Sequence, residues 1–470
     1  MKVHLSAIAG TAMASLAGLL RERGHTITGS DQDVYPPMST QLEELGIPVR
    51  SPYAEANVPE DADLVVIGNA LSRGNPEVEI VLDRKQRMTS LPAILAEEII
   101  RGHTSLVVAG THGKTTTTSI LAFILEEAGL DPSFLIGGVP VDFARSYRIG
   151  KGKLFVVEGD EYDSAFFDKR PKFVHYMPDV AVIGNLEYDH ADIYPDLASV
   201  QTAFVRLMQM VPRRGLLVAG IESAPLREIL PRAMCRVETF SLGTTKADWR
   251  GADAGPSADG GWTFRLEHLG KDLGEYRVQL PGEHNVRNAI AALAVAHFAG
   301  VSPEKVREIL PRFRGVKRRL EVKGQARGVV VFDDFAHHPT AVRETLHALR
   351  MAGRGRLVAV FEPRSYTSRT RVFQDDFARA FAGADQVVVA SAHLPGKVPE
   401  GQRLSEDDLV KAMTALGQNA RHIATVDDIV AHLARELREG DRVVILSNGG
   451  FGGIHGKLLA ALGAPAAVSP

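Results

Sequence analysis

The segment Val107-Val-Ala-Gly-Thr-His-Gly-Lys-Thr-Thr-Thr-Thr118 connects a short apolar strand pattern to an amphipathic stretch. A strand that turns on small residues and opens a helix with Gly-Lys-Thr points its backbone N–H groups at an anion. The sequence therefore predicts a phosphate-binding loop for ATP or GTP, in which Lys114 reaches the terminal phosphates and Thr115 or Thr116 offers a hydroxyl to Mg²⁺. The spacing is shorter than the strict Walker pattern, because Val108 stands where the first glycine would fall. An ordinary glycine-rich turn between a strand and a helix is the alternative interpretation.

Composition indicates a globular protein of several domains. The 470 residues are too many for one ordinary core, and 45% hydrophobic with 24% charged residues is typical of a globular chain. The net charge of −3 gives no electrostatic footprint for nucleic acid. The single cysteine, Cys235, excludes an internal disulfide and suits a reducing compartment such as the cytoplasm. We expect no membrane span, since no window approaches about eighteen uninterrupted apolar residues, and no obligatory protein partner is evident.

Short β-branched runs alternate with helical patterns along nearly the whole chain, which predicts α/β layers on largely parallel sheets. We expect three domains. They are a Rossmann-like domain over residues 1–103, a central ATP-binding domain with the phosphate loop over residues 104–317, and a second Rossmann-like domain over residues 318–470. The segment 243–282 is rich in Gly, Asp and Ser, and we interpret it as a small antiparallel appendage with strands at Trp262–His268 and Glu275–Gln279.

The first domain begins with a strand at Val3–Ala9, a turn and a helix at Met13–Arg23. Asp31 follows the second strand, where a carboxylate bonds a ribose hydroxyl in dinucleotide-binding folds. The glycine pattern is weak, because Ala7 and Ala9 stand where a stricter fingerprint has glycine. A plain strand–helix turn therefore remains open.

Two polar clusters follow strands of the central domain. The first is Glu158-Gly-Asp-Glu-Tyr-Asp163, in which Glu161 is a sensible Mg²⁺ ligand because it follows a buried-looking strand. The second, Gly184–Asp192, contains Asp189 and His190 at the same expected sheet edge, as a metal ligand or a phosphate-facing imidazole. A solvated acidic loop and a structural Asp-His pair are the alternatives.

A third cluster, Phe332–Thr340, lies in the last domain. His337 and His338 precede Pro339, which would start a helix, so both suit contact with an anion or a carboxylate. In the stretch Phe361–Thr370, Arg364 and Arg369 could grip carboxylates in bidentate fashion, or simply be exposed. In the basic linker Arg312–Arg319, Arg318 or Arg319 would close onto nucleotide phosphates when the last domain swings in, or form a solvated turn.

In this order, the motifs resemble those of the muramyl ligase superfamily, the ATP-dependent enzymes that form amide bonds in bacterial cell-wall precursors. The resemblance covers essentially the whole chain. Its segments are Gly110–Thr115, Glu158–Asp163, Asn185–His190, Gly282–Asn288, Gly315–Arg319 and Asp333–Pro339.

The resemblance implies a role for each domain. The first would hold a UDP-sugar through Gly10, Thr11, Ala12, Met13, Asp31, Ser72 and Asn75. The central domain would bind ATP and Mg²⁺. The ATP-binding set is Gly110, Thr111, His112, Gly113, Lys114, Thr115, Thr116, His284, Asn285, Asn288 and Arg319, with Thr115, Glu161 and His190 as metal ligands. The last domain would bind a peptide through His337, Arg364 and Arg369.

Within the superfamily, the chain looks most like the members that join UDP-N-acetylmuramate to the recycled tripeptide L-alanyl-γ-D-glutamyl-meso-diaminopimelate. The segments similar to those members are Tyr35–Leu42, Gly68–Glu77, Phe166–His175, Glu362–Ser365 and Ser447–His455. The L-alanine-adding members are the alternative. Many other members carry a carbamylated lysine, whose place falls here on Phe204, and no lysine occurs from Phe173 to Thr245. This departure agrees with the two subfamilies named.

The implied reaction passes through an acyl phosphate, with Lys114, Glu161 and His190 as catalytic residues. His338 or Asp334 would position or deprotonate the incoming amine, and the sequence does not choose between them. Two other classes of function stay open at this point. They are a nicotinamide-dependent oxidoreductase, suggested by the first domain, and a nucleotide-gated regulatory module without chemistry.

Overall fold

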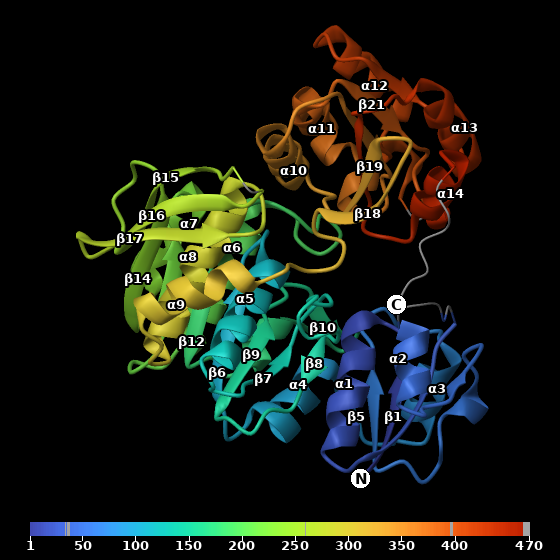
Figure 1. Ribbon diagram of the computed structural model, residues 1–470. Helices are drawn as coiled ribbons and strands as arrows, with labels where there is room; N and C mark the ends of the chain where they lie inside the picture. Colours follow the sequence, from blue (N-terminus) through green and yellow to red (C-terminus); the bar gives the residue numbers. More distant parts are fainter. Residues whose placement is uncertain (33, 35–37, 259, 395–397, 464–470) are drawn as a thin grey trace.

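Three mainly parallel sheets follow one another along the chain, each with its own helices (Figure 1). The computed structural model describes residues 1–32, 34, 38–258, 260–394 and 398–463. Tyr35, Pro36 and Pro37 of the segment Tyr35–Leu42 lie outside the described residues. The predicted α/β class, with Rossmann-like outer domains around a central domain, is confirmed.

The N-terminal sheet has five parallel strands in the order β3-β2-β1-β4-β5. Its elements are β1 (Lys2–Ser6), α1 (Thr11–Glu22), β2 (Thr26–Ser30), α2 (Met38–Glu44), β3 (Val49–Arg50), β4 (Leu64–Ile67), α3 (Pro76–Asp83), β5 (Met88–Ser90) and α4 (Leu91–Leu95). Strand β1 ends three residues before the predicted Ala9, because Ala7 turns in the left-handed region with φ 69°. The amides of Ala7 and Ile8 both donate to Ser30 O, which fixes this turn.

The central sheet has ten strands in the order β17-β16-β15-β14-β13-β12-β6-β9-β7-β8. The strands are β6 (Thr104–Ala109), β7 (Ser133–Leu135), β8 (Tyr147–Arg148), β9 (Leu154–Glu158), β12 (Val180–Ile183), β13 (Leu216–Gly220), β14 (Arg236–Leu242), β15 (Trp249–Pro256), β16 (Trp262–His268) and β17 (Lys271–Val278). A hairpin of β10 (Asp163–Ala165) and β11 (Asp168–Pro171) stands apart. The helices are α5 (Lys114–Glu127), α6 (Leu197–Met210), α7 (Ala224–Ile229), α8 (Glu283–Phe298) and α9 (Pro303–Ile309).

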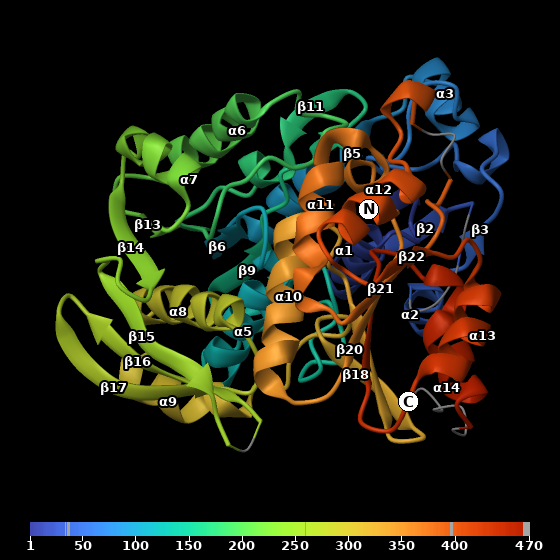
Figure 2. The ribbon, with the colours of Figure 1, turned by 90° about the horizontal axis from the view of Figure 1, so that it is seen from above.

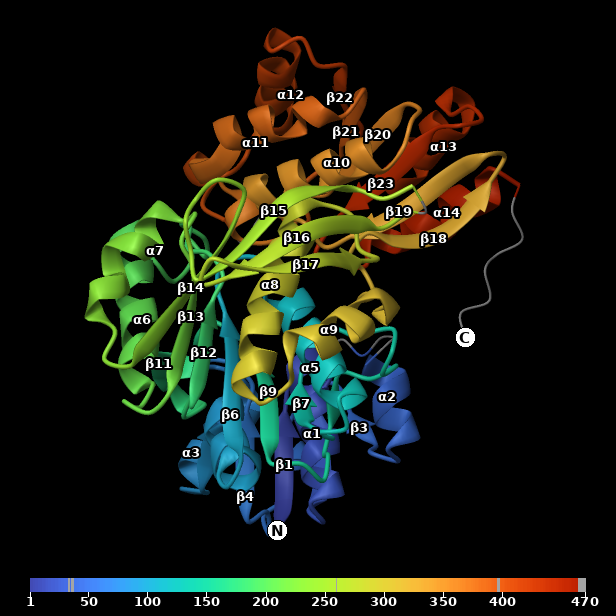
Figure 3. The same ribbon diagram turned by 60° about the vertical axis from the view of Figure 1, so that its left-hand side comes forward.

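The antiparallel appendage differs from the prediction in two ways. It contains a third strand, β15, and it continues the central sheet, since β15 pairs in parallel with β14 (Figure 3). Strand β15 was not predicted from the sequence, because it contains glycine and aspartate, which are both depleted in strands.

The C-terminal sheet has the order β18-β19-β23-β20-β21-β22, with β18 antiparallel to β19. Its elements are β18 (Glu321–Ala326), β19 (Val329–Asp334), α10 (Pro339–Ala352), β20 (Leu357–Phe361), α11 (Gln374–Ala380), β21 (Gln386–Val389), α12 (Glu406–Ala415), β22 (Ala420–His422), α13 (Val426–Glu436), β23 (Arg442–Leu446) and α14 (Ile454–Ala461). Helices α10 and α11 cover one face of this sheet, and α13 and α14 cover the other (Figure 2).

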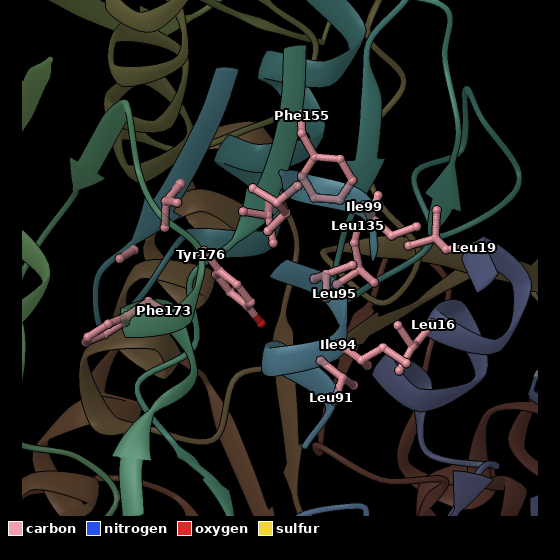
Figure 4. Packing of buried hydrophobic residues seen from close by; sticks show 14 of the residues in the cluster. Leu16, Leu19, Leu91, Ile94, Leu95, Ile99, Leu135, Phe155, Phe173 and Tyr176 are labelled. Carbon is pink, nitrogen blue, oxygen red and sulfur yellow. The ribbon is translucent and has the colours of Figure 1, made fainter. Parts of the chain in front are cut away.

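The N-terminal and central domains share one hydrophobic core. Leu16 and Leu19 of α1 face Leu95 of the α4 segment, and the same buried cluster includes Leu135 and Phe155 of the central sheet (Figure 4). The C-terminal domain buries its apolar residues in two clusters of its own. Hence the first two domains form one packed unit, and the last domain meets it mainly through polar contacts. None of the helices in the described part of the chain combines the length and apolar character needed to cross a membrane.

Candidate active site

A cavity of about 1940 Å³ lies where the three domains meet. Thr11 and Ala12 of the N-terminal domain, the phosphate loop of the central domain, and Asp334, His337 and His338 of the C-terminal domain all line it. Residues from the ends of parallel strands therefore converge on one cavity, as expected for ligand sites in open α/β sheets.

The phosphate loop has the predicted geometry. Strand β6 ends at Ala109, and α5 begins at Lys114 directly after Gly113, which has φ 80°. A β-carbon on Gly113 would lie 2.4 Å from Asn288 Oδ1, so another residue there would be strained in conformation and would have to displace the Asn288 side chain. Asn185 holds the loop from the neighbouring strand end, since its Oδ1 accepts from His112 N at 2.8 Å.

Lys114 joins two of the other predicted catalytic residues. Its Nζ donates to Glu161 Oε2 at 2.8 Å and to Gly110 O at 2.8 Å, while His190 Nε2 donates to Glu161 Oε1 at 3.0 Å. Burial alone would lower the pKa of Lys114, but the carboxylates of Glu161, Asp160 and Glu158 outweigh it and raise that pKa. Lys114 is therefore a cation at neutral pH, as phosphate binding requires.

Glu158 belongs to the site, although the sequence interpretation selected only Glu161 from its cluster. Its Oε1 accepts from Thr115 Oγ1 at 3.0 Å, and its Oε2 accepts from Gly137 N at 2.8 Å. Glu158 is the last residue of β9, which runs parallel to β6, so its side chain starts at the same sheet edge as the phosphate loop. That position was the signal available in the sequence.

The donor set suits Mg²⁺. Mg²⁺ is bound through one or two carboxylates, with water and substrate phosphates completing the shell. Thr115 contacts Glu158, and His190 contacts Glu161, which also contacts Lys114. Glu158, together with Thr115, Glu161 and His190, could hold the ion.

The expected nucleotide-binding residues of α8 also line the cavity, together with Thr116. Asn288 Nδ2 donates to Asn285 Oδ1 at 3.3 Å, and His284 Nδ1 lies 3.8 Å from Glu344 Oε2 of α10. Arg319 reaches the phosphate loop from the linker, since its Nη2 donates to Thr115 Oγ1 at 3.3 Å.

The expected UDP-sugar residues divide into two groups. Thr11 and Ala12 line the cavity, next to Gly10 at the N-cap of α1 and the buried Met13. Asp31, expected at a ribose, accepts hydrogen bonds from Ala9 N at 2.8 Å and from Tyr53 Oη at 2.9 Å in this conformation, and its role toward a ribose stays a prediction.

The second group lies in the loop before α3. Asn75 caps α3 by accepting from Glu77 N at 3.0 Å, and Asn75 N donates to Ser72 O at 3.2 Å. Asn75 thus has a structural role in this conformation.

Both candidate groups for handling the amine are already hydrogen-bonded. Asp334 Oδ2 accepts from Leu320 N at 2.7 Å, and its Oδ1 accepts from Ala336 N at 2.9 Å and Thr345 Oγ1 at 3.1 Å. Burial raises the pKa of Asp334.

His338 caps α10. Its Nδ1 accepts from Thr340 N at 3.3 Å, which leaves the proton on Nε2 to donate to Tyr188 O at 3.2 Å. Burial, followed by the neighbouring His112, lowers the pKa of His338 to about 4, so the ring is neutral at neutral pH.

The expected peptide-binding residues differ in exposure. His337 lines the cavity, with Nδ1 bonded to Phe335 O at 2.9 Å. Arg364 keeps a partly exposed guanidinium, 3.5 Å from Glu362 Oε1. Arg369 is buried and donates to the carbonyl oxygens of His393 and Leu394, both at 2.9 Å. In this conformation Arg369 therefore holds a loop of its own domain.

Similarity to known proteins covers all three domains. Residues 2–103 match the family described as "Mur ligase family, catalytic domain", residues 108–296 match "Mur ligase middle domain", and residues 318–449 match "Mur ligase, glutamate ligase domain". The UDP-N-acetylmuramate–L-alanyl-γ-D-glutamyl-meso-2,6-diaminoheptandioate ligase of Escherichia coli is 42% identical over 462 residues, 98% of either chain. The chain belongs to the Mur ligase family. The predicted domain boundaries at 103 and 317 themselves stay predictions.

Two further relatives bear on the subfamily of this Mur ligase. The murein peptide ligase structure from Psychrobacter arcticus has a TM-score of 0.75 and 39% identity, with all of both chains covered. The UDP-N-acetylmuramate–L-alanine ligase of Solibacter usitatus is 36% identical over 455 residues, 95% of this chain and 92% of its own. The predicted resemblance to the muramyl ligases is confirmed, and the protein is a ligase. The oxidoreductase and the regulatory module without chemistry are set aside.

Proposed function

We propose that this protein joins UDP-N-acetylmuramate to L-alanyl-γ-D-glutamyl-meso-diaminopimelate at the expense of ATP, in the recycling of cell-wall peptides. The cavity shared by the three domains carries the proposal, because it brings a phosphate loop together with residues of both outer domains. Such a site can hold a nucleotide, a UDP-sugar and a peptide at once. The greater identity to the tripeptide-adding relative, 42% against 36%, favours the tripeptide over L-alanine as the amine.

The chemistry follows from the poor reactivity of a carboxylate, whose leaving group would be oxide. A carboxylate oxygen of the lactyl group attacks the γ-phosphorus of ATP, the bond to ADP breaks, and an acyl phosphate forms. The neutral amine of the L-alanyl residue then attacks the acyl carbon. Inorganic phosphate leaves with the bonding electron pair, and the amine loses a proton to give the amide.

Lys114 has the position and charge to stabilise the phosphoryl transfer. Its ammonium group at the start of α5 would exchange contacts with Glu161 and Gly110 O for phosphate oxygens. Mg²⁺, held by Thr115, Glu158, Glu161 and His190, would supply further neutralisation of the charge on the phosphates. Arg319, which touches Thr115, would add a second fixed cation beside the phosphates.

His338 is the better of the two candidates for handling the amine. Its Nδ1 accepts only one long hydrogen bond, at 3.3 Å, which a substrate N–H can replace. Asp334 accepts three hydrogen bonds that connect the end of β19 to the linker and to α10. His337 and Arg364 would contact the peptide, and closure of the C-terminal domain would exclude water from the acyl phosphate.

The location of the enzyme follows from its substrates. ATP and a UDP-activated sugar are intracellular metabolites, so we propose that the protein works in the cytoplasm.

A competition assay tests the choice of amine. Tripeptide and L-alanine are supplied together at equal concentrations with ATP, Mg²⁺ and UDP-N-acetylmuramate, and the UDP products are identified by mass. The UDP-muramoyl tripeptide should exceed the UDP-muramoyl alanine by at least about tenfold, a difference of about 1.4 kcal/mol in transition-state binding. Predominant alanine product would make the protein an L-alanine ligase.

A further inference from the structure

We propose that His112, Glu187 and His338 form a binding site for a tetrahedral divalent transition-metal ion such as Zn²⁺, distinct from the magnesium site. His112 lies on the phosphate loop, Glu187 in the loop after β12, and His338 at the start of α10. The potential ligand atoms of all three side chains lie within 4.8 Å of one another.

Two of the three distances between ligand atoms are close to those around a tetrahedral ion. His112 Nε2 is 3.2 Å from Glu187 Oε2, which is 3.7 Å from His338 Nδ1. Zinc bonds of about 2.0–2.1 Å at tetrahedral angles place ligand atoms about 3.3 Å apart. Two imidazoles and one carboxylate select zinc-like ions over Mg²⁺, which prefers oxygen. Three protein ligands leave a fourth position for water or a phosphate oxygen.

The protonation states favour metal binding. Burial tends to raise the pKa of Glu187, but hydrogen bonds from His112 and Thr340 dominate and lower it to about 2, so the carboxylate is ionised. His338 is neutral at neutral pH, as described above. Glu187 and His338 would therefore not have to lose a proton before binding the ion, whereas His112 would have to release the Nε2 proton that it donates to Glu187.

The surrounding contacts orient two of the ligands. Metal-binding histidines usually donate their second ring N–H to an oxygen, and His338 Nε2 does so to Tyr188 O at 3.2 Å. Glu187 Oε2 accepts from Thr340 Oγ1 at 2.7 Å, which fixes the carboxylate. The ion would replace the His112–Glu187 hydrogen bond and the long Thr340 N contact to His338. While the ion is bound, His338 Nδ1 would therefore not be available to the substrate amine.

The site bridges two domains. His112 and Glu187 belong to the central domain, whereas His338 and Thr340 belong to the C-terminal domain. An ion bound to all three ligands would stabilise the arrangement in which these domains touch. Because ligand binding can shift a conformational equilibrium only by differential affinity, the ion should favour closure and slow any step that requires opening.

Cobalt(II) is a suitable probe, because tetrahedral Co²⁺ has a strong visible d–d absorption. The full-length protein, stripped with a chelator and kept in excess Mg²⁺, is titrated with Co²⁺ and then with competing Zn²⁺. One equivalent should give the tetrahedral spectrum and be displaced by Zn²⁺. Glu187→Gln and His338→Asn should each weaken Co²⁺ binding by about tenfold or more. Glu161→Gln is the matched control, since it alters a carboxylate of the magnesium site and should keep the spectrum.

Several results would overturn the proposal. They are an octahedral spectrum, unchanged binding in both Glu187→Gln and His338→Asn, or loss of the signal in Glu161→Gln alone. Circular dichroism of each variant separates loss of the site from loss of the fold. Small-angle X-ray scattering tests the bridge separately. Zn²⁺ should reduce the radius of gyration of the wild-type protein and leave that of Glu187→Gln unchanged, and equal radii with and without Zn²⁺ would refute the bridging role.

Discussion

At the scale of single residues, the site depends on a buried network of charges around Lys114. Its ammonium group contacts Glu161, which in turn contacts His190, so the three side chains hold one another in place. The side chain of Lys114 is 13% exposed and that of Glu161 is 3% exposed, which keeps their interaction strong relative to a surface pair. When a nucleotide binds, Lys114 would exchange its contact with Glu161 for phosphate oxygens.

Replacing Lys114 with alanine should lower ligation by on the order of 100-fold or more, because one fixed cation at the transferred phosphoryl group is lost. ADP formation under saturating substrates measures the effect, and circular dichroism checks the fold. Lys169→Ala is the control, since Lys169 pairs with Asp163 at 2.6 Å on an exposed hairpin and should retain activity within about twofold. Near-normal turnover of Lys114→Ala would remove the phosphate loop from the mechanism.

The buried His338 predicts a pH dependence of stability. Its pKa is lowered to about 4 in the folded protein, so the unfolded chain binds the extra proton first as pH falls from about 6.5 to 4. Stability should therefore decrease in that window by up to about 1.4 kcal/mol per pH unit from this residue.

His338→Asn retains a good helix N-cap but removes the titrating group, so its stability should vary less with pH between 4 and 6.5. Urea unfolding at several pH values, with chelator present, measures the slopes. His422→Gln, a partly exposed histidine in β22, serves as control. Parallel slopes for wild type and His338→Asn would contradict this assignment.

At the scale of elements, the turn into α5 couples the phosphate loop to α8. Gly113 and Gly129 both have a positive φ, of 80° and 81°, but only at Gly113 does an added β-carbon meet a neighbour, Asn288 Oδ1 at 2.4 Å. Gly129→Ala should therefore cost only about 1–2 kcal/mol of backbone strain and leave turnover unchanged.

Gly113→Ala should carry the same strain and, in addition, displace Asn288 and weaken nucleotide binding by at least about tenfold. Isothermal titration with ATP compares the two variants. Equal affinities would show that the close approach of α8 to the loop does not matter for the nucleotide.

Sequence patterns located most elements where local signals are strong. The run Trp262–His268 is strand β16 with the predicted bounds, and the predicted helix Met13–Arg23 is α1, which spans Thr11–Glu22. Strand β15 was not predicted, because its glycine-rich sequence has no strand pattern of its own. Its pairing with β14 stabilises the extended conformation. The early end of β1 likewise depends on a tertiary contact of Ala7 with Ser30.

In the candidate site, too, contacts between distant parts of the chain could not be predicted from local sequence. Positions after parallel strands, together with the family resemblance, led to the prediction that Lys114, Glu161 and His190 belong to one site, and the three side chains are in contact. The meeting of His112 with His338 could not be predicted, because it depends on the orientation of two domains rather than on any local pattern. Arg369 donates to a backbone carbonyl of its own domain, that of His393, and a contact with a loop carbonyl could not be predicted from the residue pattern.

At the scale of the whole molecule, the shared core implies that the N-terminal and central domains move as one body. Gly18 of α1 lies against Tyr147 at the end of the central sheet, so that a β-carbon there would be 2.1 Å from the ring. Glycine inside a helix usually costs about 0.5–1 kcal/mol relative to alanine. At position 18, glycine is needed because the Tyr147 ring of the central domain packs directly against the helix.

Gly18→Ala should therefore destabilise the protein by about 1–3 kcal/mol, as overpacking does. Gly456→Ala in α14, where an added β-carbon meets nothing within 4 Å, should stabilise it by up to about 1 kcal/mol. Thermal unfolding of both variants checks the opposite signs. A stabilised Gly18→Ala would indicate that the two domains are not packed as closely as described.

The central claim is that the γ-phosphoryl group of ATP passes to the lactyl carboxylate before the amide forms. UDP-N-acetylmuramate labelled with ¹⁸O in both carboxylate oxygens tests it most directly, with ATP, Mg²⁺ and tripeptide present. Mass analysis should find one ¹⁸O in each released inorganic phosphate and one in the new amide. Unlabelled phosphate alongside normal amide formation would contradict the account.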